Sequence, residues 1–224
     1  MINVAIDGPA GAGKSSVAKR VANDMGYMYI DTGAMYRTLA YKAVKNGIDI
    51  KNDIGAVSHM LDNTLIDIKY IDKNQHMYAD GKDVTDFIRT PEVSAGASDI
   101  AAIPQVRSWL LDLQRKIAAS NNCIMDGRDI GSEILPHAQV KIFLTASVEA
   151  RAKRRYDELV RNGQSVTYED IAADIAKRDE NDSTRACSPL RKASDAVLVD
   201  TSELGFEEVV NLVKKIITDK GGEM

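Results

Sequence analysis

A glycine-rich stretch near the start of the chain constrains the fold more than any other feature of the sequence. It fits the pattern G-x-x-x-x-G-K-[ST] at every specified position, with the residues Gly8, Pro9, Ala10, Gly11, Ala12, Gly13, Lys14 and Ser15. An apolar run at residues 2–6 precedes it, and apolar residues at helical spacing follow it as far as Met25. This order predicts a strand, a phosphate-binding loop and a helix.

The chemistry of this loop suits a nucleoside triphosphate. Glycines let successive backbone N–H groups turn toward an anion, and the helix that follows directs its positive dipole end to the same place. In this pattern Lys14 reaches the β- and γ-phosphates and Ser15 ligates Mg²⁺, and we count the adjacent Ser16 among the nucleotide contacts. A chance match in a flexible turn is the alternative, but glycine frequency gives it on the order of 1 % in a chain of this length. The loop alone does not show what the nucleotide is used for.

The rest of the chain alternates strands and helices. Apolar runs at 28–30, 123–125, 140–144 and 196–199 predict buried strands, and helical periodicity lies between them, including a long stretch at 91–117. Such alternation favours a parallel sheet with helices on both faces. From about residue 63 the pattern becomes that of an antiparallel hairpin. The predicted fold is therefore an α/β three-layer P-loop fold with a small antiparallel β insert.

Composition and charge exclude several classes of protein. Lysine and arginine number 29 against 33 aspartates and glutamates, and this excess of acid argues against a duplex nucleic-acid binder. Two cysteines, Cys123 and Cys187, exclude a disulfide framework and every paired-cysteine zinc pattern. No apolar stretch approaches 18 residues and no basic segment opens the chain, so we expect neither a membrane span nor a signal peptide. We expect a cytoplasmic protein, and take a monomer as the starting assumption.

Three further motifs closely resemble those of bacterial cytidylate kinases, a family of P-loop nucleoside monophosphate kinases. They are Asp31–Arg37 (DTGAMYR), Asp126–Gly131 (DGRDIG) and the segment from Arg178 to Arg185, in this order along the chain. The resemblance covers nearly the whole chain, including the hairpin insert. It implies that ATP, with Mg²⁺, phosphorylates CMP and dCMP to CDP and dCDP by in-line transfer, as a step of pyrimidine nucleotide metabolism.

The resemblance also implies which residues bind the acceptor nucleotide. They fall into those that hold its phosphate (Thr32, Arg37, Arg128 and Arg185), those that face cytosine (Ser98, Arg107 and Asp129) and those that reach the sugar and its phosphate (Arg178 and Asp182). Taken singly, each arginine is more often a solvated surface charge, although the guanidinium group is well suited to phosphate. Cytosine carries an amino donor at N4 where uracil has a carbonyl, so a carboxylate at Asp129 prefers CMP to UMP.

This reaction needs no protein base. A phosphate monoester has a second pKa near 6, so the acceptor is already largely a dianion at neutral pH. Catalysis then consists of bringing two polyanions together and neutralising the transferring phosphoryl group, a role we expect for Lys14, Arg128 and Arg185.

Two assignments leave alternatives open. Asp126 follows a buried strand and is either an outer partner of Mg²⁺ or a carboxylate that caps the next turn. Arg154 and Arg155, with Arg151, lie on a helix that either forms a lid over ATP or presents a salt-bridged, solvated face. Under the resemblance, the single domain 1–224 divides into a core (about 1–62, 100–150 and 186–224), an acceptor-side insert (about 63–99) and a lid (about 151–185).

Two other functions compete with nucleotide phosphorylation. One is a P-loop switch, although the chain has no N-K-x-D motif for reading guanine. The other is a kinase for UMP, AMP or shikimate, which the argument about Asp129 disfavours.

Overall fold

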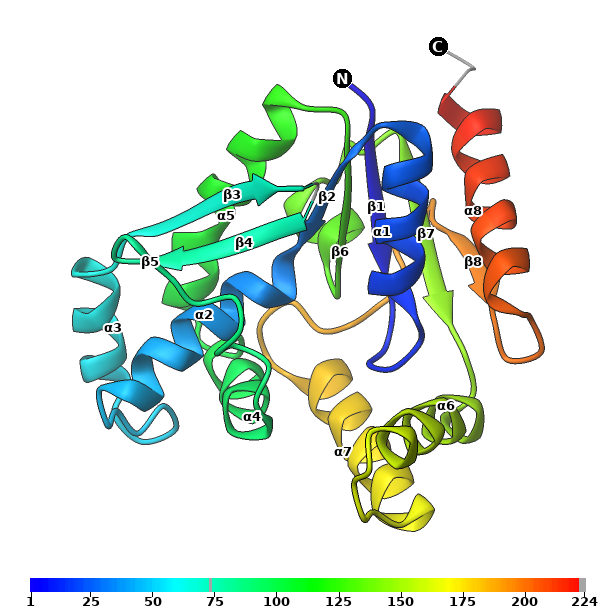
Figure 1. Cartoon of the computed structure of the whole chain (residues 1–224). Coiled ribbons are helices and arrows are strands. Elements are labelled where there is room, and N and C mark those ends of the chain that lie inside the picture. The colour runs from blue at the N-terminus through cyan, green and yellow to red at the C-terminus, as the bar shows by residue number, and fades with distance from the viewer. Residues whose placement is uncertain (73, 222–224) are drawn as a thin grey trace.

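The computed structural model describes residues 1–72 and 74–221, and a five-stranded parallel sheet lies at its centre (Figure 1). The strand order is β2-β6-β1-β7-β8, and every neighbouring pair runs parallel. The strands are β1 (Asn3–Asp7), β2 (Met28–Asp31), β6 (Cys123–Gly127), β7 (Val140–Thr145) and β8 (Val197–Asp200). The predicted parallel sheet is thus confirmed.

Apolar clusters cover both faces of this sheet, because successive side chains of each strand point to opposite sides. Val4 and Ile6 of β1 join one cluster with α1 (Lys14–Met25) and α8 (Phe206–Gly221), which lie side by side in Figure 1. Ala5 joins the other cluster, which includes side chains of α2 (Thr32–Lys45), α4 (Pro91–Ile100) and α5 (Pro104–Ser120). The three-layer arrangement is confirmed, and α3 (Ile54–Asp62) extends the second cluster.

A separate three-stranded sheet forms the predicted antiparallel insert. Its strands are β3 (Ile66–Ile71), β4 (Asn74–Ala79) and β5 (Lys82–Asp83), in that order. The Gln75 amide exchanges hydrogen bonds with the backbone of Asp31 at 2.8 and 3.2 Å, and Tyr70 Oη donates to the Tyr29 carbonyl at 3.0 Å. The insert is therefore fastened to β2 next to the point where that strand ends.

Two further helices, α6 (Val148–Arg161) and α7 (Tyr168–Thr184), pack against each other beneath the loop between β1 and α1 (Figure 1). They share a small apolar cluster of their own around Ala152, Ile171 and Ile175. Gly163, in the left-handed conformation with φ 76°, lies between them, as the sequence predicted.

The helical stretch 91–117 is two helices rather than one. Helix α4 ends at Ile100 and α5 starts at Pro104, since proline lacks the N–H that would continue the backbone ladder and suits the first turn of a new helix. Helix α3, which the apolar pattern did not predict, starts where the Asp53 carboxylate accepts the Ala56 N–H at 2.8 Å. Of the helices described, none has the length and apolar character needed to cross a membrane.

Candidate active site

One cavity of about 820 Å³ opens where β1, β2 and β6 end. Parallel α/β sheets bind ligands at this edge, since the loops that follow the strands converge there. Apart from Gly8 and Pro9, which lie outside its lining, the cavity brings together every residue singled out from the sequence. These are Ala10, Gly11, Ala12, Gly13, Lys14, Ser15, Ser16, Thr32, Arg37, Ser98, Arg107, Asp126, Arg128, Asp129, Arg154, Arg155, Arg178, Asp182 and Arg185.

The glycine-rich loop has the backbone that an anion site needs. Gly8 has φ 148°, and a Cβ there would lie 1.9 Å from the Leu144 carbonyl oxygen, so only glycine fits. Gly13, at φ 85°, precedes α1 and has no side chain to cap the first N–H groups of the helix. Those N–H groups and the positive end of the helix dipole are left for a ligand in the cavity.

Lys14 is buried at the floor of the cavity, where Nζ donates to the Pro9 carbonyl at 2.7 Å. Burial lowers the pKa of Lys14 well below its usual value, and the nearby Arg128 lowers it further. Asp126 and Asp7 act in the opposite direction. An anion beside this ammonium group would favour its charged form, as expected of a phosphate-binding lysine.

Ser15 and Asp126 lie together at the end of β6. Ser15 Oγ donates to Asp126 Oδ2 at 2.7 Å, and Tyr29 Oη donates to Oδ1 at 3.1 Å. Burial raises the pKa of Asp126 to about 6, and the Asp31 carboxylate adds to the shift. The carboxylate is thus occupied by two hydroxyl donors and not by backbone N–H groups of the following turn. A hydroxyl beside a carboxylate matches the hard oxygen donors that Mg²⁺ prefers.

Three buried arginine N–H groups line the cavity without a hydrogen-bond acceptor among the described residues: Arg37 Nε, Arg178 Nε and Arg185 Nη2. Leaving such a donor unpaired costs about 1–3 kcal/mol each. Burial lowers the pKa of both Arg178 and Arg185, and Arg128 and Arg107 respectively add to those shifts. An anion with several oxygens would satisfy these donors together, and a phosphate group has that form.

Hydrogen bonds to the protein orient the guanidinium groups of Arg37, Arg128 and Arg185. Arg37 donates to Asp31 Oδ2 at 2.8 Å, and Arg128 Nε donates to Asp182 Oδ2 at 2.7 Å. Arg185 Nε donates to the Ser188 carbonyl at 2.7 Å. Arg37 and Arg185 are thus each held by one partner, and Arg128 by two, because its Nη1 also donates to the Gly127 carbonyl at 3.2 Å. Other N–H groups of all three stay available to a ligand.

Asp129 lines the cavity and is 4 % exposed. Arg107 Nη2 donates to its Oδ2, and Arg185 Nη2 is 3.9 Å from its Oδ1. Arg107 is fixed in turn by the Ala101 carbonyl at 3.0 Å and lies over the Tyr36 ring, 5.6 Å from its centroid. This side of the cavity offers a carboxylate between two guanidinium groups and an aromatic ring.

The arginines of α6 behave differently from one another. Arg154 donates to Thr201 Oγ1 at 3.1 Å and to the Thr201 carbonyl, whereas Arg155 pairs with Glu158 at 2.8 Å on the exposed side of the helix. Arg151, which the sequence gave no reason to separate from its neighbours, is the buried member. Its Nη1 donates to the Ala10 carbonyl of the phosphate loop at 2.9 Å, and it binds Asp179 of α7 at 3.0 and 2.6 Å.

Because Arg151 joins the phosphate loop to α7, we expect Arg151→Met to destabilise the protein by about 3 kcal/mol, the low end for a broken buried ion pair. The low end applies because the Asp179 side chain is 25 % exposed. Urea unfolding measures this. Lys153→Met, which removes an exposed ion pair with Asp157 from the same helix, is the matched control and should cost less than about 1 kcal/mol. Equal losses of unfolding free energy in the two variants would show that Arg151 does not stabilise the protein by joining the phosphate loop to α7.

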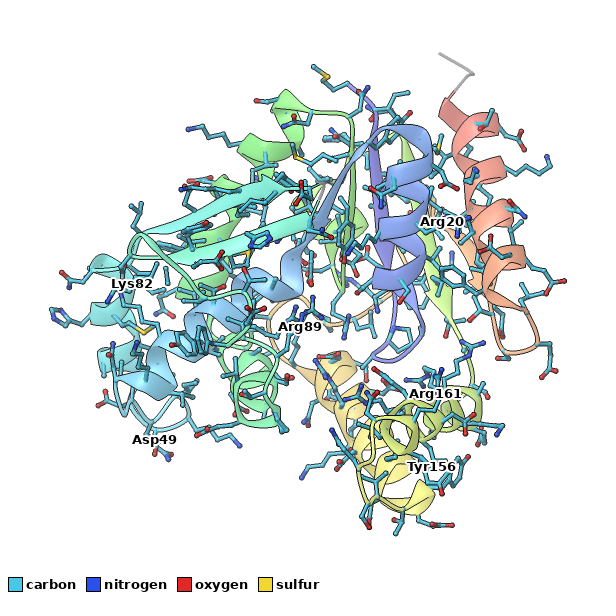
Figure 2. All side chains as sticks on the ribbon, viewed as in Figure 1. Arg20, Asp49, Lys82, Arg89, Tyr156 and Arg161 are labelled. Atoms are coloured by element: carbon cyan, nitrogen blue, oxygen red, sulfur yellow. The ribbon has the colours of Figure 1, made fainter. Side chains whose placement is uncertain are left out.

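The sequence also missed Arg89, which follows the three-stranded sheet and lines the cavity between the ribbons of α2 and α7 (Figure 2). Its Nη2 lies 3.6 Å from Asp31 Oδ2, the oxygen that Arg37 also binds. Its side chain is 72 % exposed, so it adds positive charge at the cavity mouth. No motif contains Arg89, and only its place in the fold connects it to the site.

A model of the family described as cytidylate kinase matches residues 4–219. The chain belongs to the cytidylate kinase family. It is 49 % identical over 215 residues to the cytidylate kinase of Caldicellulosiruptor bescii, covering 96 % of this chain and 95 % of that one. It is 48 % identical over 219 residues to the cytidylate kinase of Carboxydothermus hydrogenoformans, covering 98 % of each chain.

Among solved structures, an uncharacterized protein from Eubacterium ventriosum superposes with a TM-score of 0.53 at 14 % identity, covering 97 % of this chain and 98 % of that one. This likeness shows a shared fold alone. Membership of the cytidylate kinase family makes the chain a nucleoside monophosphate kinase, which phosphorylates CMP and dCMP with ATP. It decides against the switch and against a kinase for other acceptors.

Proposed function

We propose that the cavity holds ATP and CMP, or dCMP, end to end, so that the γ-phosphoryl group passes directly to the acceptor phosphate. The observation that carries the proposal is that the glycine-rich loop meets, in one cavity, three arginine N–H groups with no acceptor in the described part of the chain. Two sets of hydrogen-bond donors, the loop N–H groups and the arginine N–H groups, face the same cavity. This arrangement suits two polyanions that must approach each other.

On the donor side, we assign the ATP phosphates to residues 8–16, with Lys14 on the β- and γ-phosphates. Ser15 and Asp126 would hold Mg²⁺, which, when bound, neutralises negative charge on the donor phosphates. The hydrogen bond of 2.7 Å between these two side chains supports the pairing. Among residues 1–72 and 74–221, no group of three or more histidine, cysteine, aspartate or glutamate residues offers an all-protein metal site. This is compatible with a Mg²⁺ ion held largely by phosphates and water.

On the acceptor side, the phosphate of CMP would receive hydrogen bonds from Arg37, Arg128 and Arg185. Thr32 lies beside them, with its Oγ fixed on the Asp126 carbonyl at 2.7 Å. Arg178 and Asp182 would reach the sugar, and Ser98 and Arg107 would face the base with Asp129. The burial of Arg178 and Arg185 supports these roles, because a buried guanidinium N–H that lacks an acceptor among the described residues favours an anionic partner.

The chemical step follows from these positions. The acceptor phosphate is largely a dianion at neutral pH, so its oxygen attacks the γ-phosphorus without transferring a proton to the protein. As the bond to the β–γ bridging oxygen breaks, negative charge moves onto ADP, and Lys14 is placed to stabilise it. Arg128 and Arg185 would neutralise the acceptor, which otherwise repels the donor.

Closure over the donor would exclude water and so prevent hydrolysis of ATP. We assign this lid to about residues 151–185, whose apolar cluster is separate from the two clusters on the sheet. The core would comprise about residues 1–62, 100–150 and 186–224, and the acceptor-side insert about 63–99. Arg154 and Arg155 are the lid residues that we assign to ATP. We place the reaction in the cytoplasm, which suits two free cysteines.

ADP release in a coupled assay tests the proposed function. With ATP and Mg²⁺ present, CMP and dCMP should support turnover far above UMP, AMP or no acceptor. Turnover that needs no acceptor would contradict transfer to a nucleotide, and a preference for UMP or AMP would contradict the proposed base contact.

Replacing Asp129 by alanine should lower kcat/KM for CMP more than for UMP. We expect the CMP/UMP ratio of kcat/KM to fall by about tenfold, because a carboxylate paired with a base amino group discriminates by about 1–3 kcal/mol. Steady-state kinetics with both acceptors provide the measurement. Equal losses for the two acceptors would show that Asp129 does not contact the base.

A further inference from the structure

Asp7, the last residue of β1, has a role that neither the phosphate loop nor the acceptor motifs explain. Its side chain is 5 % exposed. Its Oδ1 accepts the N–H of Ile130 at 2.8 Å, and its Oδ2 accepts the N–H of Gly131 at 2.7 Å. Asp7 therefore binds, from a neighbouring strand, the turn that follows β6 and the two residues after it.

That turn is a short π-helix, η1 (Ile130–Ile134). The first N–H groups of any helical turn have no acceptor within the helix, and an aspartate at the preceding position usually supplies one. The preceding residue here is Asp129. Among the described contacts, however, its side chain makes no capping hydrogen bond and instead binds Arg107. Two aspartates are thus available to one turn, and Asp7 alone caps it.

We propose that Asp7 is a positioning residue for base recognition, which frees the carboxylate of Asp129 to face cytosine by capping η1 in its place. This inference rests on the proposed contact between Asp129 and the base. It gives the aspartate before the glycine-rich loop a part in choosing the acceptor as well as in placing the donor loop.

The surroundings of Asp7 support this role. Burial raises the pKa of Asp7 to about 6 and the charge of Asp129 adds to the shift, while the two N–H donors of the turn oppose it. Both of its oxygens accept N–H groups, which fits the carboxylate form. At Gly131 an added Cβ would lie 3.4 Å from Asp7 Oδ2 and 3.2 Å from Lys141 Cδ, so a glycine suits this close approach.

The position of Asp7 in the sheet places it next to both the phosphate loop and the segment that carries Asp129. Asp7 is paired in register with Gly127 of β6, and Gly8 follows it directly. The same short segment therefore sets the start of the phosphate loop and the direction of the Asp129 side chain. A change at Asp7 that keeps the size of the side chain should therefore leave the donor loop in place and alter the choice of acceptor.

Asp7→Asn tests the proposal, because the amide keeps the shape of the carboxylate but offers only one acceptor oxygen to two N–H donors. Asp129 precedes the turn and could accept the released donor, which would turn its carboxylate away from the base. We expect the CMP/UMP ratio of kcat/KM to fall by about tenfold or more. The KM for ATP should change by less than about threefold, a split that general destabilisation would not produce.

Asp53→Asn is the matched control, since it removes an exposed aspartate that caps α3 far from the cavity. It should leave the ratio unchanged. In an Asp129→Asn background, Asp7→Asn should have no further effect on the ratio, because the two residues act through one contact. Further loss in that background would overturn the proposal.

The remaining outcomes separate the two claims. If Asp129→Asn lowers the ratio and Asp7→Asn does not, Asp7 has no positioning role and the base contact stands. If Asp129→Asn leaves the ratio unchanged, the proposed base contact fails and the inference about Asp7 fails with it. Should Asp7→Asn not fold, Asp7→Ser is used instead, because one hydroxyl oxygen cannot replace both carboxylate oxygens. A ratio unchanged within about threefold in that variant would overturn the proposal.

Discussion

Lys14→Met is expected to lower kcat by about a thousandfold or more, without lowering the midpoint of thermal unfolding. The first effect follows because Lys14 is the buried cation at the floor of the glycine-rich loop, where the transferring group gains charge in the transition state. Removing one such electrostatic contact costs about 10²–10³ in kcat in other enzymes, and a full charge on a phosphoryl group has a larger effect.

The second effect follows from the same burial. The pKa of Lys14 is lowered by burial and then by Arg128, so the charged form is held in the folded protein at a cost. Methionine keeps much of the aliphatic stem and removes that cost. Stability should therefore stay the same or rise while activity is lost, as is typical of residues that serve the reaction and not the fold.

Steady-state kinetics and a thermal melt measure the two effects. Lys19→Ala is the matched control, because Lys19 is an exposed lysine on the same helix and outside the cavity lining. We expect it to change kcat by less than about twofold. A Lys14 variant that lost activity only in proportion to a loss of folded protein would contradict the catalytic role.

Arg128→Ala is expected to lower kcat by about 10²–10³ and to raise the KM for CMP, while ATP binding is little changed. Arg128 lines the cavity, its Nε is held by Asp182 at 2.7 Å, and in the proposed arrangement it lies between the two nucleotides. Its loss would remove positive charge from between the two nucleotides and leave the buried Asp182 carboxylate without its partner.

This prediction is specific because the variant should lose affinity for CMP but keep its affinity for ATP. Fluorescent ATP-analogue binding reports the donor side, and initial rates across CMP concentration report the acceptor side. Arg191→Ala removes an exposed arginine paired with Glu133 at 3.3 Å and should leave both unchanged. A loss of ATP affinity as large as the loss of CMP affinity would place Arg128 on the donor side instead.

The sequence predicted the parallel sheet and the phosphate loop because both have strong local signals. Buried parallel strands are short apolar runs, and the loop has a fixed spacing of glycines before a lysine. Other elements were missed where the local signal is weak or interrupted. Helix α3 is only partly buried. The apolar periodicity of residues 91–117 continues across Pro104, although the helix is interrupted just before that residue.

The site was predictable as far as motifs extend. Arg151 was not separated from the other arginines of its helix, because its role depends on the Ala10 carbonyl, 141 residues away in the chain. Asp7 only follows an apolar run in the sequence, and its partners, the N–H groups of Ile130 and Gly131, lie more than 120 residues later. Long-range contacts of this kind leave no pattern in a single sequence, and only the fold reveals them.

A crystal structure with CMP and a non-hydrolysable ATP analogue tests the central claim most directly. We expect both nucleotides in the one cavity, with an acceptor phosphate oxygen about 3–3.5 Å from the γ-phosphorus and in line with the bond that breaks. Arg37 Nε and Arg185 Nη2 should each lie within hydrogen-bond distance of the acceptor phosphate. CMP bound away from the end of the glycine-rich loop, with those N–H groups still unpaired, would contradict the account.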